Sequence, residues 1–277
     1  MVSTSSALFG FAAGVLLAAA IARSFTRRHL SRLRAAERRA RANERMAEIG
    51  AMTGGLAHEI KNPLSTIGLN AQLLAEGIED LPIEPEEKGP LSRRVGALKR
   101  EADRLRGILA DFLQYAGQLR LDPKPTDLNS LVEELADFYA PQAQSQSVRL
   151  RLELAKGPVR AALDVPQVKQ AVLNLMLNAV QAMADPKLAV KDLILRTDRR
   201  TDRDRRPVVE LHVIDTGPGI SPDAMERIFQ PYFTTKSGGT GLGLPTARRL
   251  IEGHEGRLEV HTEAGRGTDF TVIFPAL

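Results

Sequence analysis

The stretch "LAHEIKNPL" (residues 56–64) brings together side chains that can act in nucleophilic and acid–base chemistry. His58 lies two residues from an apolar position on either side, so at about 100° per residue it points roughly 160° away from both and faces outward. Glu59 adjoins this imidazole, and Asn62 lies one turn later on the same face. Pro63 removes the backbone donor that would bond the Glu59 carbonyl. An isolated exposed histidine is usually just a solvated surface residue, but these neighbours indicate a functional imidazole.

A second group of residues has the composition of a nucleotide site. The alternating strand "VVELHVIDTGPGI" (208–220) stops at Asp215, whose carboxylate can accept a hydrogen bond from the exocyclic amine of a base. The glycines that follow, Gly217 and Gly219, let the backbone approach a ring closely. Lys236 ends "IFQPYFTTK" (228–236) and can reach phosphates. Further glycines at 238, 239, 241 and 243 lead into a helix, whose first backbone N–H groups bind anions.

A predicted helix between these groups carries stacked amides. Asp164 caps its start, and Gln170, Asn174 and Asn178 repeat every four residues beside a buried apolar stripe. Asparagine is a poor residue for the middle of a helix, which favours a role as an oxygen ligand. The alternative is a solvated polar face. The order of the asparagines, Asp215 and the glycine loop favours a nucleotide site.

Two long helices must present His58. Apolar residues recur in alternating steps of three and four from 46 to 78 and again from 91 to 112, as in a coiled coil. The segment "DLPIEPEEKGP" (80–90) holds three prolines and a glycine and predicts the turn between them. One hairpin cannot cover both apolar seams, so we expect two copies to form a four-helix bundle, which makes the protein a homodimer.

The segment from about Gln118 onward predicts an α/β domain. We expect a strand within "LRLDPKPTDL", a helix over about 128–144, strands over 148–154 and 159–164, and then the asparagine helix. The C-terminal "GRLEVHTEAGRGTDFTVIFP" predicts two strands joined around Gly265 to Gly267, with Thr268 at the start of the last strand.

The composition of the chain limits which chemistry and which partners are possible. The chain of 277 residues has no cysteine, which excludes disulfides and thiolate chemistry. Eight arginines lie between residues 23 and 41, and the rest of the chain carries a net charge near −3, so no nucleic-acid partner is expected.

The first 22 residues are uncharged, and the arginines come after them, as in an uncleaved membrane anchor rather than a secretory signal. A cleaved signal or a buried helix are the alternatives. The positive-inside bias predicts a single-pass inner-membrane protein whose catalytic part is cytoplasmic. Because few residues precede the span, we expect no extracytoplasmic domain.

From about residue 46 to the C-terminus, these segments resemble the sensor histidine kinases of two-component systems. "LAHEIKNPL" resembles the family's phosphoacceptor box, "NLMLNAVQA" its asparagine box, and "DTGPGI", "FQPYFTTK" and "GTGLGL" the boxes that frame its ATP lid. The resemblance implies an α+β chain in four parts: a transmembrane anchor (1–23), a basic juxtamembrane linker helix (24–45), a helical dimerisation and phosphotransfer domain (46–117) and a catalytic ATP-binding sandwich of the GHKL type (118–277).

The resemblance also implies roles for individual residues. His58 is the phosphorylated nucleophile, Glu59 is the base, and Asn62 matches a position associated with phosphatase activity. Asn178 ligates Mg²⁺ with Asn174 nearby, and Asp215 binds the adenine of ATP, helped through water by Thr268. Phosphate and lid contacts are expected from Lys236, Gly239, Thr240, Gly241, Leu242 and Gly243. The carboxylate with which hydrolytic relatives activate water is absent, because Asn174 and Gln170 stand in that region.

The expected function is therefore ATP-dependent autophosphorylation of His58, followed by transfer to an aspartate of a response-regulator receiver domain. One alternative is a protein that acts mainly as a phosphatase of that regulator. Another is a nonenzymatic membrane adaptor. The remaining histidines are not expected to be catalytic, because none pairs with an acid at useful sequence spacing.

Overall fold

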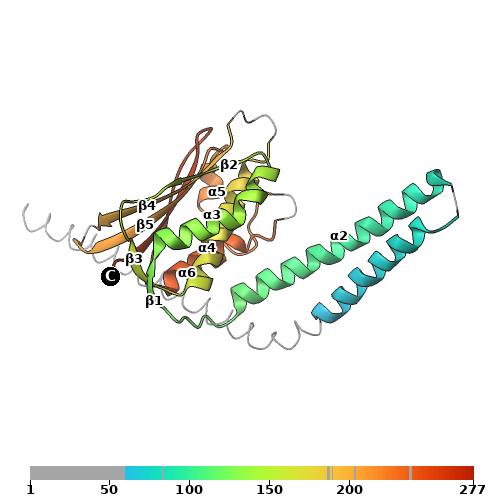
Figure 1. Ribbon diagram of the computed structural model, residues 1–277, viewed down its shortest axis with the longest axis horizontal. Coiled ribbons are helices and arrows are strands. Elements are labelled where there is room, and N and C mark those ends of the chain that lie inside the picture. The colour runs from blue at the N-terminus through green and yellow to red at the C-terminus, as the bar shows by residue number, and fades with distance from the viewer. Residues whose placement is uncertain (1–59, 83, 186–187, 189, 203, 237–238) are drawn as a thin grey trace, which may run out of the picture.

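The computed structural model describes residues 60–277, except 83, 186–187, 189, 203 and 237–238. A helical hairpin is followed by an α/β domain, and the hairpin projects away from that domain (Figure 1). The predicted anchor, the linker helix, His58 and Glu59 lie outside the described residues. No helix within the described part of the chain is long and apolar enough to span a membrane.

The hairpin consists of a helix described over 60–79 and of α2, Pro85–Ala116. The predicted turn over 80–90 was too long. Pro85 occupies the first turn of α2, where a missing N–H costs nothing, and Pro90 lies inside the helix. The Lys88 ammonium donates to the Glu79 carbonyl across the turn (2.8 Å) and so links the two helices.

The coiled-coil seam is only partly covered within one chain. Ala71 and Ala102 are buried between the two helices, but Ile67, Leu74 and Leu98 are at least half exposed. Large apolar side chains on one face of a hairpin favour a second helical surface against them. This exposed face is the surface that the homodimer prediction requires.

The α/β domain is built on a five-stranded sheet with the order β2-β4-β5-β7-β6. Its strands are β2 (Arg149–Glu153), β4 (Asp192–Thr201), β5 (Pro207–Asp215), β6 (Arg257–Glu263) and β7 (Gly267–Pro275). β2 and β4 are parallel, and the other neighbours are antiparallel. A separate antiparallel pair joins β1 (Lys124–Asp127) to β3 (Arg160–Leu163).

Three helices cover one face of the large sheet: α3 (Leu128–Ser145), α4 (Val165–Ala182) and α6 (Gly243–Gly253) (Figure 1). The short α5 (Pro222–Met225) lies between β5 and α6 in the chain. Alternate residues of β5, such as Leu211 and Val213, point into the core against Leu175 and Phe270. The Asp164 carboxylate accepts the Gln167 N–H and caps α4, as the sequence predicts.

Helices α3, α4 and α6 and strands β1, β2, β3, β5, β6 and β7 confirm the predicted elements. Helix α5 and strand β4 were not expected from the sequence. β4 alternates inward residues such as Leu193 and Leu195 with charged outward residues, and its charged end at 198–200 resembles a loop. This strand matters for the site because it holds β5 in register from Leu193 opposite Asp215 to Thr201 opposite Pro207.

Candidate functional site

Asp215 is a buried carboxylate at the end of β5. Its side chain is 2% exposed, and one oxygen accepts the Gly217 N–H at 2.8 Å. Burial raises the pKa of this carboxyl to about 6, while the N–H groups of Gly217 and Thr268 favour its charged form. Thr268 lies opposite Asp215 in the β5–β7 ladder and is also buried. The structure therefore brings together the two residues predicted to hold adenine.

Two glycines of the site have backbone conformations that would be strained for any other residue type. Gly219 has φ +77°, and a Cβ there would lie 2.5 Å from the Glu263 carbonyl oxygen. Gly241 has φ +68°, and its Cβ would lie 2.6 Å from the carbonyl carbon of Tyr232. The Gly241 carbonyl accepts the Tyr232 N–H (3.2 Å). The two glycine motifs therefore pack closely against backbone of β6 and of the "FQPYFTTK" segment.

Asn178 on α4 contacts Lys236, although 58 residues separate them. The Lys236 ammonium donates to the Asn178 amide oxygen (2.6 Å), to the Asn178 backbone carbonyl (2.9 Å) and to the Gln181 amide oxygen (3.4 Å). Burial lowers the pKa of Lys236 to about 8, and the nearby Asp215 partly opposes that shift. The Asn178 amide oxygen, which is predicted to ligate a metal ion, thus accepts a hydrogen bond from an ammonium group of the protein itself.

Asn174 connects α4 to the start of α6. Its amide nitrogen donates to the Gly243 carbonyl (3.3 Å), and its amide oxygen accepts from Gln170 (3.2 Å). These contacts position the glycine loop beside α4 and explain why amides recur every four residues. The polar face is therefore an interhelical contact as well as a candidate ligand surface.

The glycine loop also contacts the helical hairpin. The Thr240 hydroxyl donates to the Asp111 carboxylate of α2 (2.9 Å) and accepts the Leu242 N–H (3.3 Å). Leu242 is fully buried, and its N–H is bound to Thr240, so in this structure it supports the loop from inside. Arg249 of α6 donates to the carbonyls of Tyr115 and Gly117 at the end of α2. The nucleotide domain is thus joined to the hairpin at the loop predicted to bind phosphate.

Of the phosphoacceptor residues, the structure describes Asn62 and Pro63. Both are exposed on the helix over 60–79. The hydroxyls of Ser65 and Thr66 donate to the carbonyls of Lys61 (2.9 Å) and Asn62 (3.1 Å), so carbonyls around the proline have alternative partners. Because Asn62 is exposed, its side-chain amide can contact a partner protein, as its predicted role requires.

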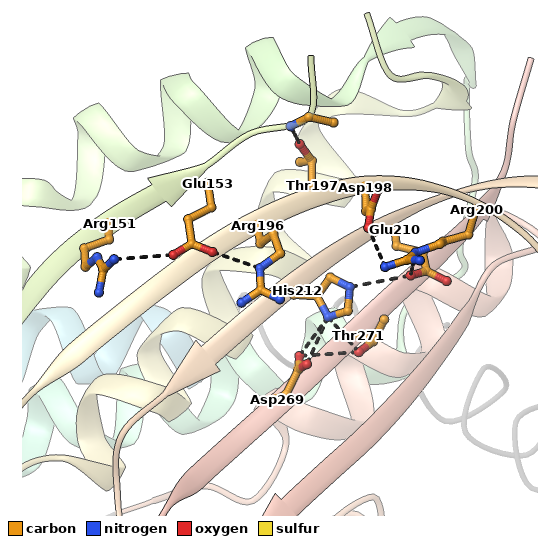
Figure 2. Close-up of polar contacts among 11 residues, drawn as sticks. Arg151, Glu153, Arg196, Thr197, Asp198, Arg200, Glu210, His212, Asp269 and Thr271 are labelled. Atoms are coloured by element: carbon orange, nitrogen blue, oxygen red, sulfur yellow. Dashed lines mark hydrogen bonds and ion pairs between the residues drawn. The ribbon is translucent and has the colours of Figure 1, made fainter. Parts of the chain in front are cut away.

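The sequence spacing showed no acid partner for His212, but the structure places two carboxylates beside it. Its Nδ1 lies 3.0 Å from the Asp269 carboxylate and its Nε2 lies 3.5 Å from Glu210, as Figure 2 shows. The hydrogen bond to Asp269 raises the pKa of His212. Sequence spacing could not find this pair, because the β5–β7 ladder joins residues 57 positions apart. His212 points to the face of the sheet opposite Asp215, so it lies outside the nucleotide site.

Sequence reasoning also missed Gln181, Asp111 and Arg249. Gln181 follows Asn178 by three residues and could have been found from helical spacing. Asp111 and Arg249 meet their partners across more than 120 residues of chain, so no local pattern reveals them.

The chemistry of the site follows from this arrangement. A buried carboxylate can bind an amine of a base, and the glycine loop and Lys236 can bind phosphates. Among the described residues, no cluster of three or more His, Asp or Glu side chains forms a metal site. A metal ion here would depend on amide oxygens together with oxygens of a ligand.

Two family models match the chain. Residues 48–117 match the His Kinase A (phospho-acceptor) domain, and residues 163–277 match the histidine kinase-, DNA gyrase B- and HSP90-like ATPase. Sensor histidine kinase ZraS of Salmonella typhimurium is 33% identical over 270 residues, which cover 96% of this chain and 54% of that protein. Sensor protein kinase PilS of Pseudomonas aeruginosa is 32% identical over 232 residues, which cover 83% of this chain and 41% of that protein. The chain thus spans about half the length of these curated relatives.

Two solved structures resemble the whole described architecture. Full-length ShkA in complex with AMPPNP is 26% identical with a TM-score of 0.62, over 82% of this chain and 46% of ShkA. ThkA in complex with the response regulator protein TrrA is 26% identical with a TM-score of 0.58, over 84% of this chain and 64% of that one. The comparisons and the geometry agree on a helical phosphoacceptor region followed by an ATPase domain.

Proposed function

The chain belongs to the sensor histidine kinases of two-component systems, and we propose from this premise that it phosphorylates its own His58 from Mg-ATP and passes the phosphoryl group to an aspartate of a receiver domain. The observation that carries the proposal is the buried Asp215 carboxylate beside Gly217, in the same domain as Asn178 and Lys236. Such a site holds adenine at one end and phosphates at the other.

Each side of the site has its own task. Asp215 accepts a hydrogen bond from the adenine amine, and Gly219 leaves room for the ring beside the backbone of β6. The loop over 239–243 and Lys236 contribute backbone donors and positive charge along the phosphates. Phosphoryl transfer depends mainly on positioning and charge stabilisation, so these contacts account for much of the catalysis.

The residues at the metal position fit Mg²⁺. Asn178 offers an amide oxygen, the kind of ligand that a hard cation prefers, and that oxygen already accepts the Lys236 ammonium. When bound, Mg²⁺ would neutralise charge that develops on the phosphates. Asn174, by contrast, is engaged with Gly243 and Gln170, which supports a positioning role for it.

Transfer to the protein requires His58 and Glu59. Glu59 takes the ring proton as the imidazole attacks the terminal phosphorus, and a phosphohistidine and a nucleoside diphosphate result. Because Gln170 and Asn174 replace a carboxylate base, water is not activated inside the ATP site. This favours transfer to histidine over hydrolysis.

A second candidate activity is removal of phosphate from the regulator. Asn62 is exposed on the outer face of its helix, where an amide can orient water on a phosphorylated partner. Pro63 would let the hairpin bend between kinase and phosphatase states, so Pro63→Ala is expected to change the ratio of the two activities. An unchanged ratio would count against this role for the proline.

The assembly and location are part of the proposal. The exposed seam of the hairpin and the match to a phosphoacceptor domain support a homodimer. ThkA, a relative of known structure, forms a complex with a response regulator, which supports a receiver domain as partner. The uncharged N-terminal run and its following arginines support a single-pass inner-membrane anchor with the domains 46–117 and 118–277 in the cytoplasm.

Autophosphorylation tests the proposal directly. Purified chain is incubated with Mg²⁺ and γ-labelled ATP, and the label is tested for the acid lability of a phosphohistidine. His58→Gln should abolish labelling, and the matched change His261→Gln, at an exposed strand histidine, should leave it intact. Label that survives in the His58→Gln variant would refute the assignment.

A further inference from the structure

The last turns of α4 carry a cluster of oxygen atoms around one ammonium group. The Asn178 amide oxygen, the Asn178 backbone carbonyl and the Gln181 amide oxygen lie 2.6, 2.9 and 3.4 Å from the Lys236 ammonium. An ammonium has three N–H donors, so this set can use all of them. Because every contact is to oxygen, the cluster has the chemistry of a site for a hard cation.

This contact conflicts with the role of Asn178 as a metal ligand. Under the proposed function, on which this inference rests, the Asn178 amide oxygen binds Mg²⁺ beside the phosphates. An ammonium and a divalent ion on the same oxygen would be like charges at very short separation, in a site with limited access to water. The two cations therefore cannot share Asn178, and one must leave before the other binds.

We propose that Lys236 is the resting occupant of the Asn178 oxygens, that Mg-nucleotide displaces it, and that Gln181 is the positioning residue that retains it. The displaced ammonium then moves to the phosphates, so one side chain serves two successive sites. This exchange makes tight nucleotide binding depend on the metal ion, because without the metal Lys236 remains bound to α4.

The backbone around Lys236 supports an exchange by side-chain rotation alone. The Lys236 N–H donates to the Thr234 hydroxyl (3.1 Å), and the Lys236 carbonyl accepts the Gly239 N–H (3.3 Å). These two bonds hold the backbone of Lys236 while its four-carbon stem changes direction. No large movement of the chain is required.

A substitution at Gln181 can alter the exchange of Lys236 without removing a group that binds the nucleotide. It is exposed, lies one turn after Asn178, and contributes one acceptor to the resting ammonium. Among the described residues, none of its hydrogen bonds involves Asp215 or the glycine loop, unlike Lys236 and Asn178, which serve the proposed site directly. A Gln181→Met variant keeps the length of the side chain and removes the acceptor.

The test is titration calorimetry of ADP binding to the full-length chain, with Mg²⁺ over a series of concentrations and with EDTA, at constant pH and ionic strength. A lost hydrogen bond of ordinary strength predicts that Gln181→Met raises the affinity for ADP in Mg²⁺ about two- to tenfold and lowers the Mg²⁺ midpoint by the same factor. The affinity in EDTA should stay the same. Lys156→Met, at an exposed lysine outside the site, is the control and should alter none of these values.

A second measurement examines the contact without any ligand. In nuclear magnetic resonance spectra of the ligand-free chain, Lys236→Met should shift the side-chain amide resonance of Asn178, and Lys156→Met should not. An unmoved resonance, or an unchanged or weakened affinity for Mg-ADP in Gln181→Met, would overturn the exchange and leave the proposed function standing. Failure of the unaltered chain to bind ADP at any Mg²⁺ concentration would instead refute the proposed function.

Discussion

Replacement of the buried carboxylate Asp215 by asparagine should weaken nucleotide binding and stabilise the fold. The pKa of Asp215 is raised from 3.8 to about 6, because burial penalises its charged form. The folded chain therefore holds this proton more tightly than the unfolded chain, and the free energy of unfolding falls as the pH rises from about 4 to about 6. Above about pH 6 the charged carboxylate carries the full cost of its burial, and Asp215→Asn removes that cost.

The size of the gain follows from the shift. A difference of about 2 pKa units corresponds to about 3 kcal/mol at pH 7.5, and the gain should shrink to near zero at pH 3. The Gly217 N–H can still donate to the asparagine oxygen, but the new amide N–H groups are buried and need acceptors, so about 3 kcal/mol is the upper limit of the gain. The affinity for ADP should fall more than tenfold, because the adenine amine loses a charged acceptor.

Urea titrations of the ligand-free chain at both pH values measure this effect, with circular dichroism as the probe. Asp137→Asn, at an exposed position of α3, is the matched control and should change the free energy of unfolding by less than about 0.5 kcal/mol. A loss of stability in Asp215→Asn at pH 7.5, or a gain that does not depend on pH, would show that burial does not penalise the charged form of Asp215.

Three further predictions concern other parts of the site. In the unaltered chain, ADP affinity measured by calorimetry should fall as the pH drops through about 6, because Asp215 gains a proton there; a flat profile between pH 5 and 8 would contradict this. Gly241→Ala should lower the free energy of unfolding by more than about 1 kcal/mol, because the φ of Gly241 is +68°. Gly243→Ala should fold normally, because a Cβ at that position would meet no atom within 4 Å. Equal melting temperatures of the two variants would count against strain at Gly241. His254→Ala should lower the free energy of unfolding by about 1–3 kcal/mol without changing the affinity for ADP, because its ring accepts the Asp164 N–H and donates to the Leu250 carbonyl. A catalytic defect with intact stability would show that this histidine has another role.

The sequence could predict those parts of the fold that depend on local pattern. The apolar stripe of α4 and its cap at Asp164 are set within a few residues, and α3 was expected over about 128–144, close to its observed bounds. The prolines misled the turn prediction, because Pro85 lies in the first turn of α2, where it costs little, and Pro90 lies inside the helix, where a proline is normally unfavourable. β4 was missed because its outward face carries charges that pair across the sheet, as in Arg196 with Glu153.

Long-range contacts of the site were beyond local reasoning. The position of Asp215 was predicted, because a strand that ends in "DTGPGI" carries its own chemical pattern. The contact of Lys236 with Asn178 and that of Thr240 with Asp111 depend on how α4 and α2 pack against the glycine loop. The pairing of His212 with Asp269 depends on strand register, which local periodicity leaves open.

We propose that one imidazole receives the terminal phosphoryl group of ATP bound by the C-terminal domain. The most direct test of this proposal is to locate the phosphate on the intact chain by peptide mapping with mass spectrometry at alkaline pH, after incubation with Mg-ATP. We expect phosphate on His58 alone, and none on a chain that carries Asp215→Asn when the ATP concentration lies below the raised Kd of that variant. Phosphate on any other residue, or none on a chain that binds ATP normally, would contradict it.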